Sequence, residues 1–150
     1  MARKITMAIT AVAFATTLTA CGPGVDAPTR LIQQVTNGVE ANVKTDDTLI
    51  YVRNLHISLN PAGDASLIAT IVNQKEKPDA LVALAINNQE IKIESIDAIQ
   101  NKPIIFGGPS SNANAALPGS GLIAGHRYPV SLFFGVSGSV TLDALVVAED

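Results

Sequence analysis

Apolar and polar residues alternate along several short stretches of this chain, the pattern of β-strands with one buried face. The clearest stretch runs from Thr48 to Asn60. The parity predicted to face inward holds Leu49, Tyr51, Leu55, Ile57 and Leu59, and the outward parity holds Thr48, Asn54, His56, Ser58 and Asn60. Arg53 interrupts the first set, and Ile50 and Val52 interrupt the second. Whether the first half of this strand is covered on both faces is therefore left open.

The same pattern predicts further strands. Residues 65–73 place Leu67, Ala69 and Ile71 on one face. The other expected strands are a nearly continuous apolar run at 80–87 that suits a central strand, an amphipathic stretch at 90–95, a short apolar piece at 104–106, and a closing hairpin of residues 128–134 and 139–148. In the hairpin, Leu132 and Phe134 lie on the core parity and Phe133 on the opposite one.

Turn residues separate these strands. Gly, Pro, Asn and Asp cluster at 61–64, 87–88 and 135–138, where tight turns need them. Short strands punctuated by turns, without a convincing helix, predict an all-β, antiparallel sandwich of about seven strands. Residues 30–43 are ambiguous, because their apolar positions suit either a first strand or a loose helical turn.

The N-terminus has the layout of an export signal. Arg3 and Lys4 precede an apolar or small run from Ile5 to Thr17, which is shorter than the ~20 residues of a membrane-spanning helix. We therefore predict a signal peptide at residues 1–20, a Gly- and Pro-rich tether at 21–29 and a single β-sandwich domain at 30–150.

The end of this signal, Leu18-Thr19-Ala20-Cys21, is similar to the lipobox of bacterial lipoproteins. The resemblance implies a diacylglyceryl thioether on Cys21, cleavage before it, and fatty acylation, for example with palmitate, of the new N-terminus. The alternative is a chance cysteine, although Cys21 is the only cysteine in the chain. The expected location is the outer face of the plasma membrane, with the lipid as the membrane anchor.

Composition excludes several function classes. The formal net charge is −3 and becomes more negative once Arg3 and Lys4 leave with the signal, so nucleic acid is not an expected partner. No Gly-x-Ser-x-Gly elbow is present, and Asp46-Asp47 is predicted to be a solvated turn. We expect no catalytic residues, no cofactor and no enzymatic activity.

The second half of the chain resembles the PCuAC-type periplasmic copper chaperones. The similar segments are 68–73 followed by Glu76-Lys77-Pro78-Asp79-Ala80-Leu81, and 125–134 followed by Gly138-Ser139-Val140-Thr141-Leu142. The resemblance implies a cupredoxin-like, Greek-key β-sandwich. The lipobox together with Ile50-Tyr51-Val52-Arg53-Asn54 resembles, within that group, the actinobacterial lipoproteins of the LpqE type.

The copper ligands of that family are missing here. Its His-x-Met pattern falls on Ile93-Glu94-Ser95, and its ligand loop falls on 107–112, which contains neither His nor Met. Met1 and Met7, the two methionines, lie in the signal. No metal site is therefore expected; the alternative is a remodelled copper or zinc site using His56 and His126, since nitrogen and oxygen ligands suit Cu(II) or Zn(II).

The functional prediction is a lipid-anchored, non-enzymatic binding or chaperone-like module of the cell envelope, whose sandwich presents loops to a partner. The long loop at 107–121 is the candidate binding surface, through Ser110, Ser111, Asn112 and Asn114. These side chains offer donors and acceptors without charge. They suit a glycan, a lipid head group or a protein backbone; the alternative function is the metallochaperone with a remodelled site.

Overall fold

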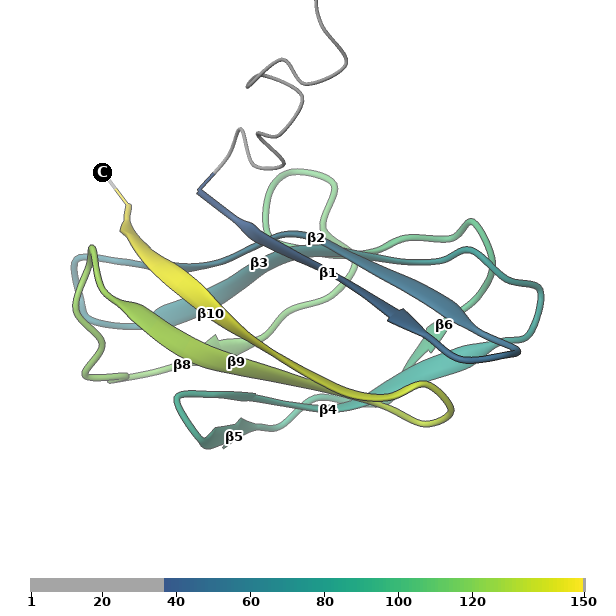
Figure 1. Ribbon diagram of the computed structural model, residues 1–150. Coiled ribbons are helices and arrows are strands. Elements are labelled where there is room, and N and C mark those ends of the chain that lie inside the picture. The colour runs from purple at the N-terminus through teal and green to yellow at the C-terminus, as the bar shows by residue number, and fades with distance from the viewer. Residues whose placement is uncertain (1–36, 150) are drawn as a thin grey trace, which may run out of the picture. The chain divides into compact units, whose positions relative to one another are not determined.

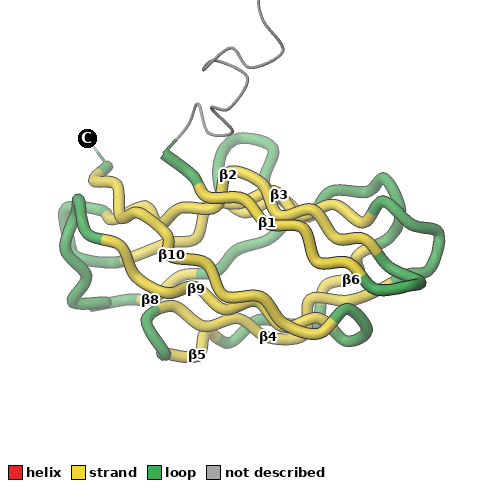
Figure 2. The backbone as a smooth tube through the Cα atoms, in the orientation of Figure 1, coloured by secondary structure: helices red, strands yellow, loops and turns green. Residues whose placement is uncertain are grey.

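The computed structural model describes residues 37–149, which fold into two packed layers of β-strand without a helix (Figures 1 and 2). The strands are β1 (Val39–Lys44), β2 (Leu49–Leu59), β3 (Ala65–Asn73), β4 (Asp79–Ile86), β5 (Gln89–Ile91), β6 (Ile96–Ala98), β7 (Ile104–Phe106), β8 (Ala116–Leu117), β9 (Arg127–Phe134) and β10 (Gly138–Ala148). Within this range, no helix is long and apolar enough to cross a membrane. The predicted signal, tether and Cys21 lie outside the described residues.

The strand order confirms the predicted sandwich. Seven strands follow one path, β5-β4-β9-β10-β2-β3-β7, while β1, β6 and β8 are short additions that pair with β2, β4 and β3. The ambiguous stretch near the domain's start is thus a strand from Val39 onward. The predicted strand at 90–95 is shorter than expected, because β5 ends at Ile91. The central position expected for β4 is confirmed, since it pairs with β9 on one side and with β5 and β6 on the other.

Strand β10 belongs to both layers. Its first part, Gly138 to Leu145, pairs antiparallel with β9, and its last part, Val146 to Ala148, pairs parallel with β2. Figure 1 shows it running obliquely from one layer to the other. A strand that changes sheets in this way closes a corner of the sandwich. Among the ten strands, all pairings are therefore antiparallel except this one, which the sequence pattern did not predict.

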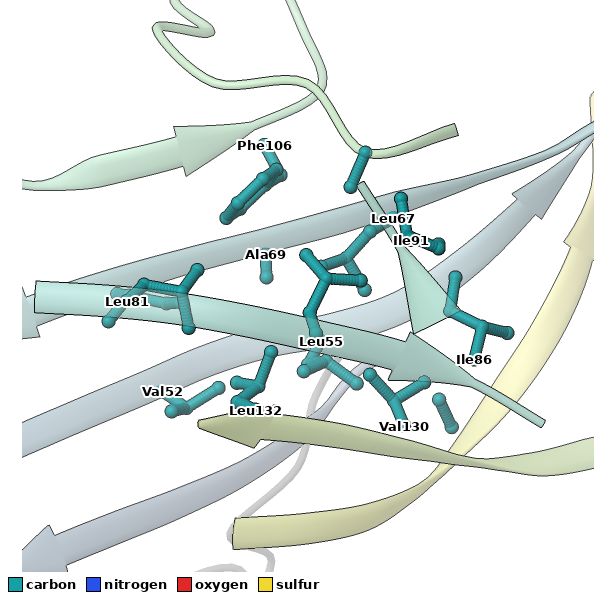
Figure 3. Close-up of a cluster of buried hydrophobic side chains, with 14 of the residues drawn as sticks. Val52, Leu55, Leu67, Ala69, Leu81, Ile86, Ile91, Phe106, Val130 and Leu132 are labelled. Atoms are coloured by element: carbon teal, nitrogen blue, oxygen red, sulfur yellow. The ribbon is translucent and has the colours of Figure 1, made fainter. Parts of the chain in front are cut away.

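The core lies between the two layers and is almost entirely aliphatic (Figure 3). The inward residues predicted for β3 and β9 are confirmed as buried: Leu67, Ala69, Ile71, Leu132 and Phe134. Val130 is buried on the same face of β9. Leucine, isoleucine and valine from facing strands fill the space at close packing. The two layers are thus held mainly by burial of apolar surface.

The predicted parity of β2 is right only in its second half. Leu55 and Ile57 are buried as expected, but in the first half Ile50 and Val52 are fully buried, whereas Leu49 and Tyr51, predicted to point inward, are only partly buried. The register shifts between Arg53 and His56, and Asn54 adopts a left-handed backbone with φ 52°. An extra residue at a β-bulge reverses which side chains face the core.

Thr48, just before β2, and Ser58, on β2, are buried, although the alternation predicted that both face solvent. Ser58 Oγ donates to Glu149 Oε1 at 2.5 Å. Thr48 belongs to a buried polar network. Polar residues at these positions are buried because partners from distant segments satisfy their hydrogen bonds, which periodicity alone does not reveal.

That network is centred on Asp79, at the start of β4. Its Oδ1 accepts hydrogen bonds from the backbone N–H of Ala80 and Val136, at 2.7 and 2.8 Å. Its Oδ2 accepts from the N–H and the hydroxyl of Ser137, at 2.9 and 2.5 Å. Burial raises the pKa of Asp79, but the hydrogen bonds from Ser137, Ala80 and Val136 outweigh it and hold the pKa below its usual value.

Two threonines continue the network into the other layer. Thr48 Oγ1 lies 2.7 Å from Ser137 Oγ, and Thr45 Oγ1 lies 2.6 Å from Thr48 Oγ1. The Ser137 proton is committed to the Asp79 carboxylate, so Thr48 donates to Ser137 and Thr45 donates to Thr48. Every hydroxyl therefore points its proton toward the carboxylate. This chain joins the β1–β2 turn, the start of β4 and the β9–β10 turn.

Replacing Asp79 by Asn should remove this anchor while keeping the shape of the side chain. The amide nitrogen of Asn cannot accept the bonds that Oδ2 accepts, so the free energy of unfolding at pH 7 should fall by about 1.5–3 kcal/mol. Because the folded-state pKa of Asp79 is lowered, its contribution is present above the unfolded pKa of about 3.9 and is lost as the pH falls below it.

Urea unfolding of both proteins between pH 7 and pH 3 measures this difference. The stability gap between wild type and the Asp79→Asn variant should narrow below about pH 4. Asp143→Asn, which alters an exposed carboxylate that forms no hydrogen bond within residues 37–149, should follow the wild type throughout. A gap that stays constant down to pH 3 would show that the charge on Asp79 does not contribute.

Candidate functional site

The predicted binding loop at 107–121 is hydrogen-bonded to β7, the edge strand of the sheet. The Asn112 side chain accepts a hydrogen bond from Ile105 N–H at 2.8 Å and donates to Pro103 O at 2.9 Å. The backbone N–H groups of Asn112 and Ala113 both donate to Ile105 O, at 3.0 and 3.1 Å. The exposed edge of β7 is thus satisfied by the loop, which protects it from pairing with another chain.

The second half of this loop is part of the domain's packing. Ala115 is buried in the core, and its carbonyl accepts from Leu67 N–H at 2.9 Å. Strand β8 then pairs with β3. Further along, Gly119 N–H donates to Asp64 Oδ1 at 2.9 Å, and Ser120 Oγ donates to the backbone of the β2–β3 turn at 3.0 Å.

Of the four residues predicted to bind through this loop, Asn112 is committed to holding β7. Ser110, Ser111 and Asn114 are exposed, and none of their side chains forms a hydrogen bond within residues 37–149. A binding role for these three residues stays a prediction. The loop therefore serves first as a cover for a sheet edge.

The two histidines lie on different elements. His56 is partly buried on β2, and its Nδ1 donates to Asn54 O at 3.0 Å, which leaves Nε2 as the remaining ring nitrogen. His126 is exposed and directly precedes β9. Within residues 37–149, no group of three or more His, Cys, Asp or Glu side chains lies close enough to hold a metal ion.

The residues present do not fit the copper site that the resemblance implies. Residues 37–149 contain neither methionine nor cysteine, since Met1, Met7 and Cys21 all precede them. At the position of the His-x-Met pattern, Ile93 is partly buried and Glu94 and Ser95 are exposed. Thioether sulfur and clustered imidazoles are the ligands that hold Cu(I), so the described domain lacks the donors for that ion.

The predicted solvated turn at Asp46-Asp47 is confirmed. Both carboxylates are exposed, and Asp47 Oδ2 accepts a hydrogen bond from Lys77 Nζ at 2.7 Å. This bond and the lysine's charge lower the pKa of Asp47. Such an exposed ion pair contributes little to stability.

A shallow depression that sequence reasoning did not identify lies on the outer face of the β5-β4-β9 layer. It has a volume of about 320 Å³ and is lined by Ala83, Ala85, Asn88, Glu90 and Phe133. The sheet register places these side chains together: Ala83 is opposite Phe133, and Ala85 is opposite Glu90. Asn88 comes from the β4–β5 turn, where its backbone is left-handed with φ 62°. The small alanines leave room beside the phenylalanine ring.

Apolar side chains extend this surface beyond the depression. The register of β4 shifts between Leu81 and Ala83, and the extra residue, Val82, is 45% exposed. Phe133 is 41% exposed, and Val136, in the β9–β10 turn, is 47% exposed. Val82 lies beside this turn, since a Cβ added at Gly135 would be 3.7 Å from Val82 Cγ1. We call Val82, Ala83, Ala85, Phe133 and Val136 the outer patch.

Comparison with known proteins identifies the fold. No protein-family model and no curated protein sequence matches this chain. Among solved structures, the chain is similar to the copper-bound PCuAC domain from PmoF2, with a TM-score of 0.60 and 20% identity over 74% of this chain and 99% of that one. It is similar to the apo PCuAC domain from PmoF1, with a TM-score of 0.60 and 22% identity over 74% and 100% of the two chains.

A third similar structure, the apo PCuAC domain of PmoF2, has a TM-score of 0.55 and 18% identity over 73% of this chain and 97% of that one. At this level of identity the comparisons show the fold alone. They confirm the predicted cupredoxin-like β-sandwich. The described domain has a PCuAC-like fold without the sulfur ligands that the family resemblance would require.

Asn112→Ala should loosen the covered edge of β7. The change removes the hydrogen bonds to Ile105 N–H and Pro103 O, and the free energy of unfolding should fall by about 1–2 kcal/mol. Asn114→Ala changes a residue of the same loop whose side chain forms no hydrogen bond in the described part of the chain, so it should stay within about 0.5 kcal/mol of wild type. Urea denaturation measures both. Equal effects of the two changes would show that Asn112 does not hold the edge.

Copper binding should be no tighter than nonspecific. Since neither a methionine nor a cysteine is available in residues 37–149, we expect the purified protein to lose a competition for Cu(I) against a chromogenic chelator. The competition is read from the absorbance of the chelator complex. Stoichiometric removal of Cu(I) from the chelator, abolished by His56→Ala or His126→Ala, would contradict this expectation.

Proposed function

We propose that this protein is a non-enzymatic binding module of the cell envelope that uses the outer patch to engage a protein partner. The observation that carries the proposal is the exposed phenylalanine ring of Phe133 beside the depression. Aromatic side chains with neighbouring apolar residues supply much of the binding energy at protein interfaces. Scattered apolar residues are normal on a surface, but here Ala83, Ala85 and Phe133 line one depression, and Val82 directly precedes Ala83 in β4.

The arrangement of polar groups supports binding rather than catalysis. A hydrolytic site requires a nucleophile, a base and an orienting group within hydrogen-bond reach of one another. The buried carboxylate of Asp79 is fully occupied by structural hydrogen bonds, and the depression contains a single ionisable side chain, Glu90. A rigid sandwich that displays one apolar surface suits recognition.

The proposal includes attachment to the outer face of the plasma membrane through lipid on Cys21. The Leu18-Thr19-Ala20-Cys21 sequence supports it, and two or more acyl chains hold a protein at a bilayer stably. With this anchor, the LpqE-type lipoproteins of actinobacteria are the proposed relatives. The exposed Ser110, Ser111 and Asn114 of the 107–121 loop offer a secondary contact for a glycan or lipid head group.

A metallochaperone with a remodelled site is the second candidate, and the PCuAC-like fold is what favours it. Such a site would have to draw on His56 and His126 together with carboxylates. Nitrogen and oxygen ligands would suit Cu(II) or Zn(II). This candidate has less support than a docking surface, because no three His, Cys, Asp or Glu side chains of the described domain lie close enough to hold a metal ion.

Site-specific cross-linking in intact cells tests the binding proposal. A photoreactive phenylalanine analogue replaces Phe133 in the full-length chain, and a matched chain carries it at Thr70, on the outer face of the other layer. Irradiation should give a discrete cross-linked protein band from position 133 and none from position 70. Absence of a band at 133, with normal expression and folding, would overturn the proposal.

Cys21→Ala should abolish anchoring. Without the thiol that carries the diacylglyceryl group, the chain should lose the lipid-bearing N-terminal peptide and accumulate with its signal uncleaved or in released form. Mass spectrometry of the N-terminal peptide and fractionation of membranes measure the outcome. A wild-type N-terminal peptide that begins elsewhere than at Cys21, or carries no diacylglycerol, would contradict the lipid anchor.

A further inference from the structure

We propose that the depression beside Phe133 accepts a positively charged side chain, a lysine or arginine, from an extended segment of the partner protein. This inference rests on the proposed function, because it assigns a chemistry to the same surface. Three features of the depression point to a cation: an available carboxylate, an aromatic face, and a small apolar floor.

The carboxylate of Glu90 is available for a ligand. Glu90 is exposed on β5 and lines the depression. The ion pairs of the described domain are Arg53 with Glu40 and Lys77 with Asp47, and no hydrogen bond engages the Glu90 side chain within residues 37–149. A carboxylate without an internal cation at the rim of an apolar hollow attracts a cation from outside.

The ring of Phe133 supplies the second feature. The face of an aromatic ring is electronegative and attracts an ammonium or guanidinium group. The same protein already uses such a contact elsewhere, since Arg53 Cζ lies 4.4 Å from the ring centre of Tyr51 while Arg53 also pairs with Glu40. Glu90 on β5 and Phe133 on β9 line the same depression from opposite sides of β4, so a long cationic side chain entering it can pass the ring and end at the carboxylate.

Size and apolarity fit one long side chain. The volume of about 320 Å³ is near the lower limit of about 300–1,000 Å³ for pockets that enclose small molecules. Ala83 and Ala85 form an apolar floor along which the methylene stem of lysine or arginine can lie while its charged end reaches Glu90. The Asn88 carboxamide, also at the rim, can accept a further hydrogen bond from the cation.

The exposed valines favour a peptide as the carrier of this cation. Val82 and Val136 continue the apolar surface away from Glu90, and neither would be covered by a free amine in the depression. An extended segment with apolar residues two positions before and after its lysine or arginine, on the same face of the strand, would cover both. A neutral sugar would use the phenylalanine ring but would leave the Glu90 charge without a partner.

The test uses the purified full chain in detergent and four fluorescein-labelled peptides of sequence Val-Ala-X-Ala-Val, which places the valines on the same face as X when extended, with X arginine, lysine, norleucine or glutamate. Fluorescence anisotropy measures their affinities. The arginine and lysine peptides should bind about tenfold more tightly than the norleucine peptide, which has a similar stem without a charge. High salt should weaken the binding of the charged peptides.

Two variants and two matched controls locate the effect. Glu90→Gln should remove the preference for arginine over norleucine, and Phe133→Ala should weaken all peptides. Glu94→Gln, another exposed carboxylate, and Ile123→Ala, another exposed apolar residue, should leave the affinities unchanged. Circular dichroism of each variant confirms that it folds.

Several results would overturn the inference. One is equal binding of the arginine and norleucine peptides, and another is an arginine preference that survives Glu90→Gln. Concentration-dependent dimerisation in analytical ultracentrifugation, abolished by Phe133→Ala, would assign the surface to a second copy. Binding of a neutral trisaccharide in place of the peptides would assign it to a glycan. A cross-link from position 133 that persists in any of these cases would leave the binding function standing and reject only the cation.

Discussion

The buried hydrogen-bond chain from Asp79 through Ser137 and Thr48 to Thr45 is the constraint on which one end of this sandwich depends. A carboxylate that is 5% exposed is costly to bury unless its oxygens are satisfied, and here four donors satisfy them. The donors come from segments nearly sixty residues apart in the chain. The two layers are therefore joined by a polar connection as well as by apolar packing, and the geometry of the β9–β10 turn is fixed.

The β9–β10 turn also positions part of the outer patch. Val136 donates its backbone N–H to Asp79, so its side chain is directed outward and remains 47% exposed. Gly135, in the same turn, lies beside Val82 and the Asp79 carboxylate. The buried network and the exposed apolar patch thus share one turn, with the backbone serving the first and the side chains forming the second. A change in the network would be expected to move the patch.

Sequence alternation predicted the strands that remain regular, and it failed where the backbone departs from a two-residue repeat. Leu67, Ala69 and Ile71 follow strict alternation and are buried as predicted. In β2, the left-handed Asn54 inserts a residue and reverses the parity of Leu49 and Tyr51. The burial of Thr48 depends on a partner 89 residues away, and the position of Asn112 depends on an edge strand. Such long-range partners leave no periodic signal, whereas Phe133, a large apolar residue on an outward parity, was a local signal for the patch.

The absence of methionine and cysteine from residues 37–149 and the position of the outer patch both bear on where this fold can hold a ligand. A site built from loops at the end of a sandwich requires those loops to project polar or sulfur-bearing side chains toward one point. In this chain the 107–121 loop instead packs against the sheet. Asn112 binds the edge strand β7, Ala115 accepts a hydrogen bond from β3, and Gly119 donates one to Asp64. The depression is instead lined mainly from strands β4, β5 and β9, and its Glu90 carboxylate has no partner within residues 37–149. Strands hold side chains at fixed spacing with little loss of entropy on binding, which is the physical reason that the proposed recognition surface is the face of the sheet.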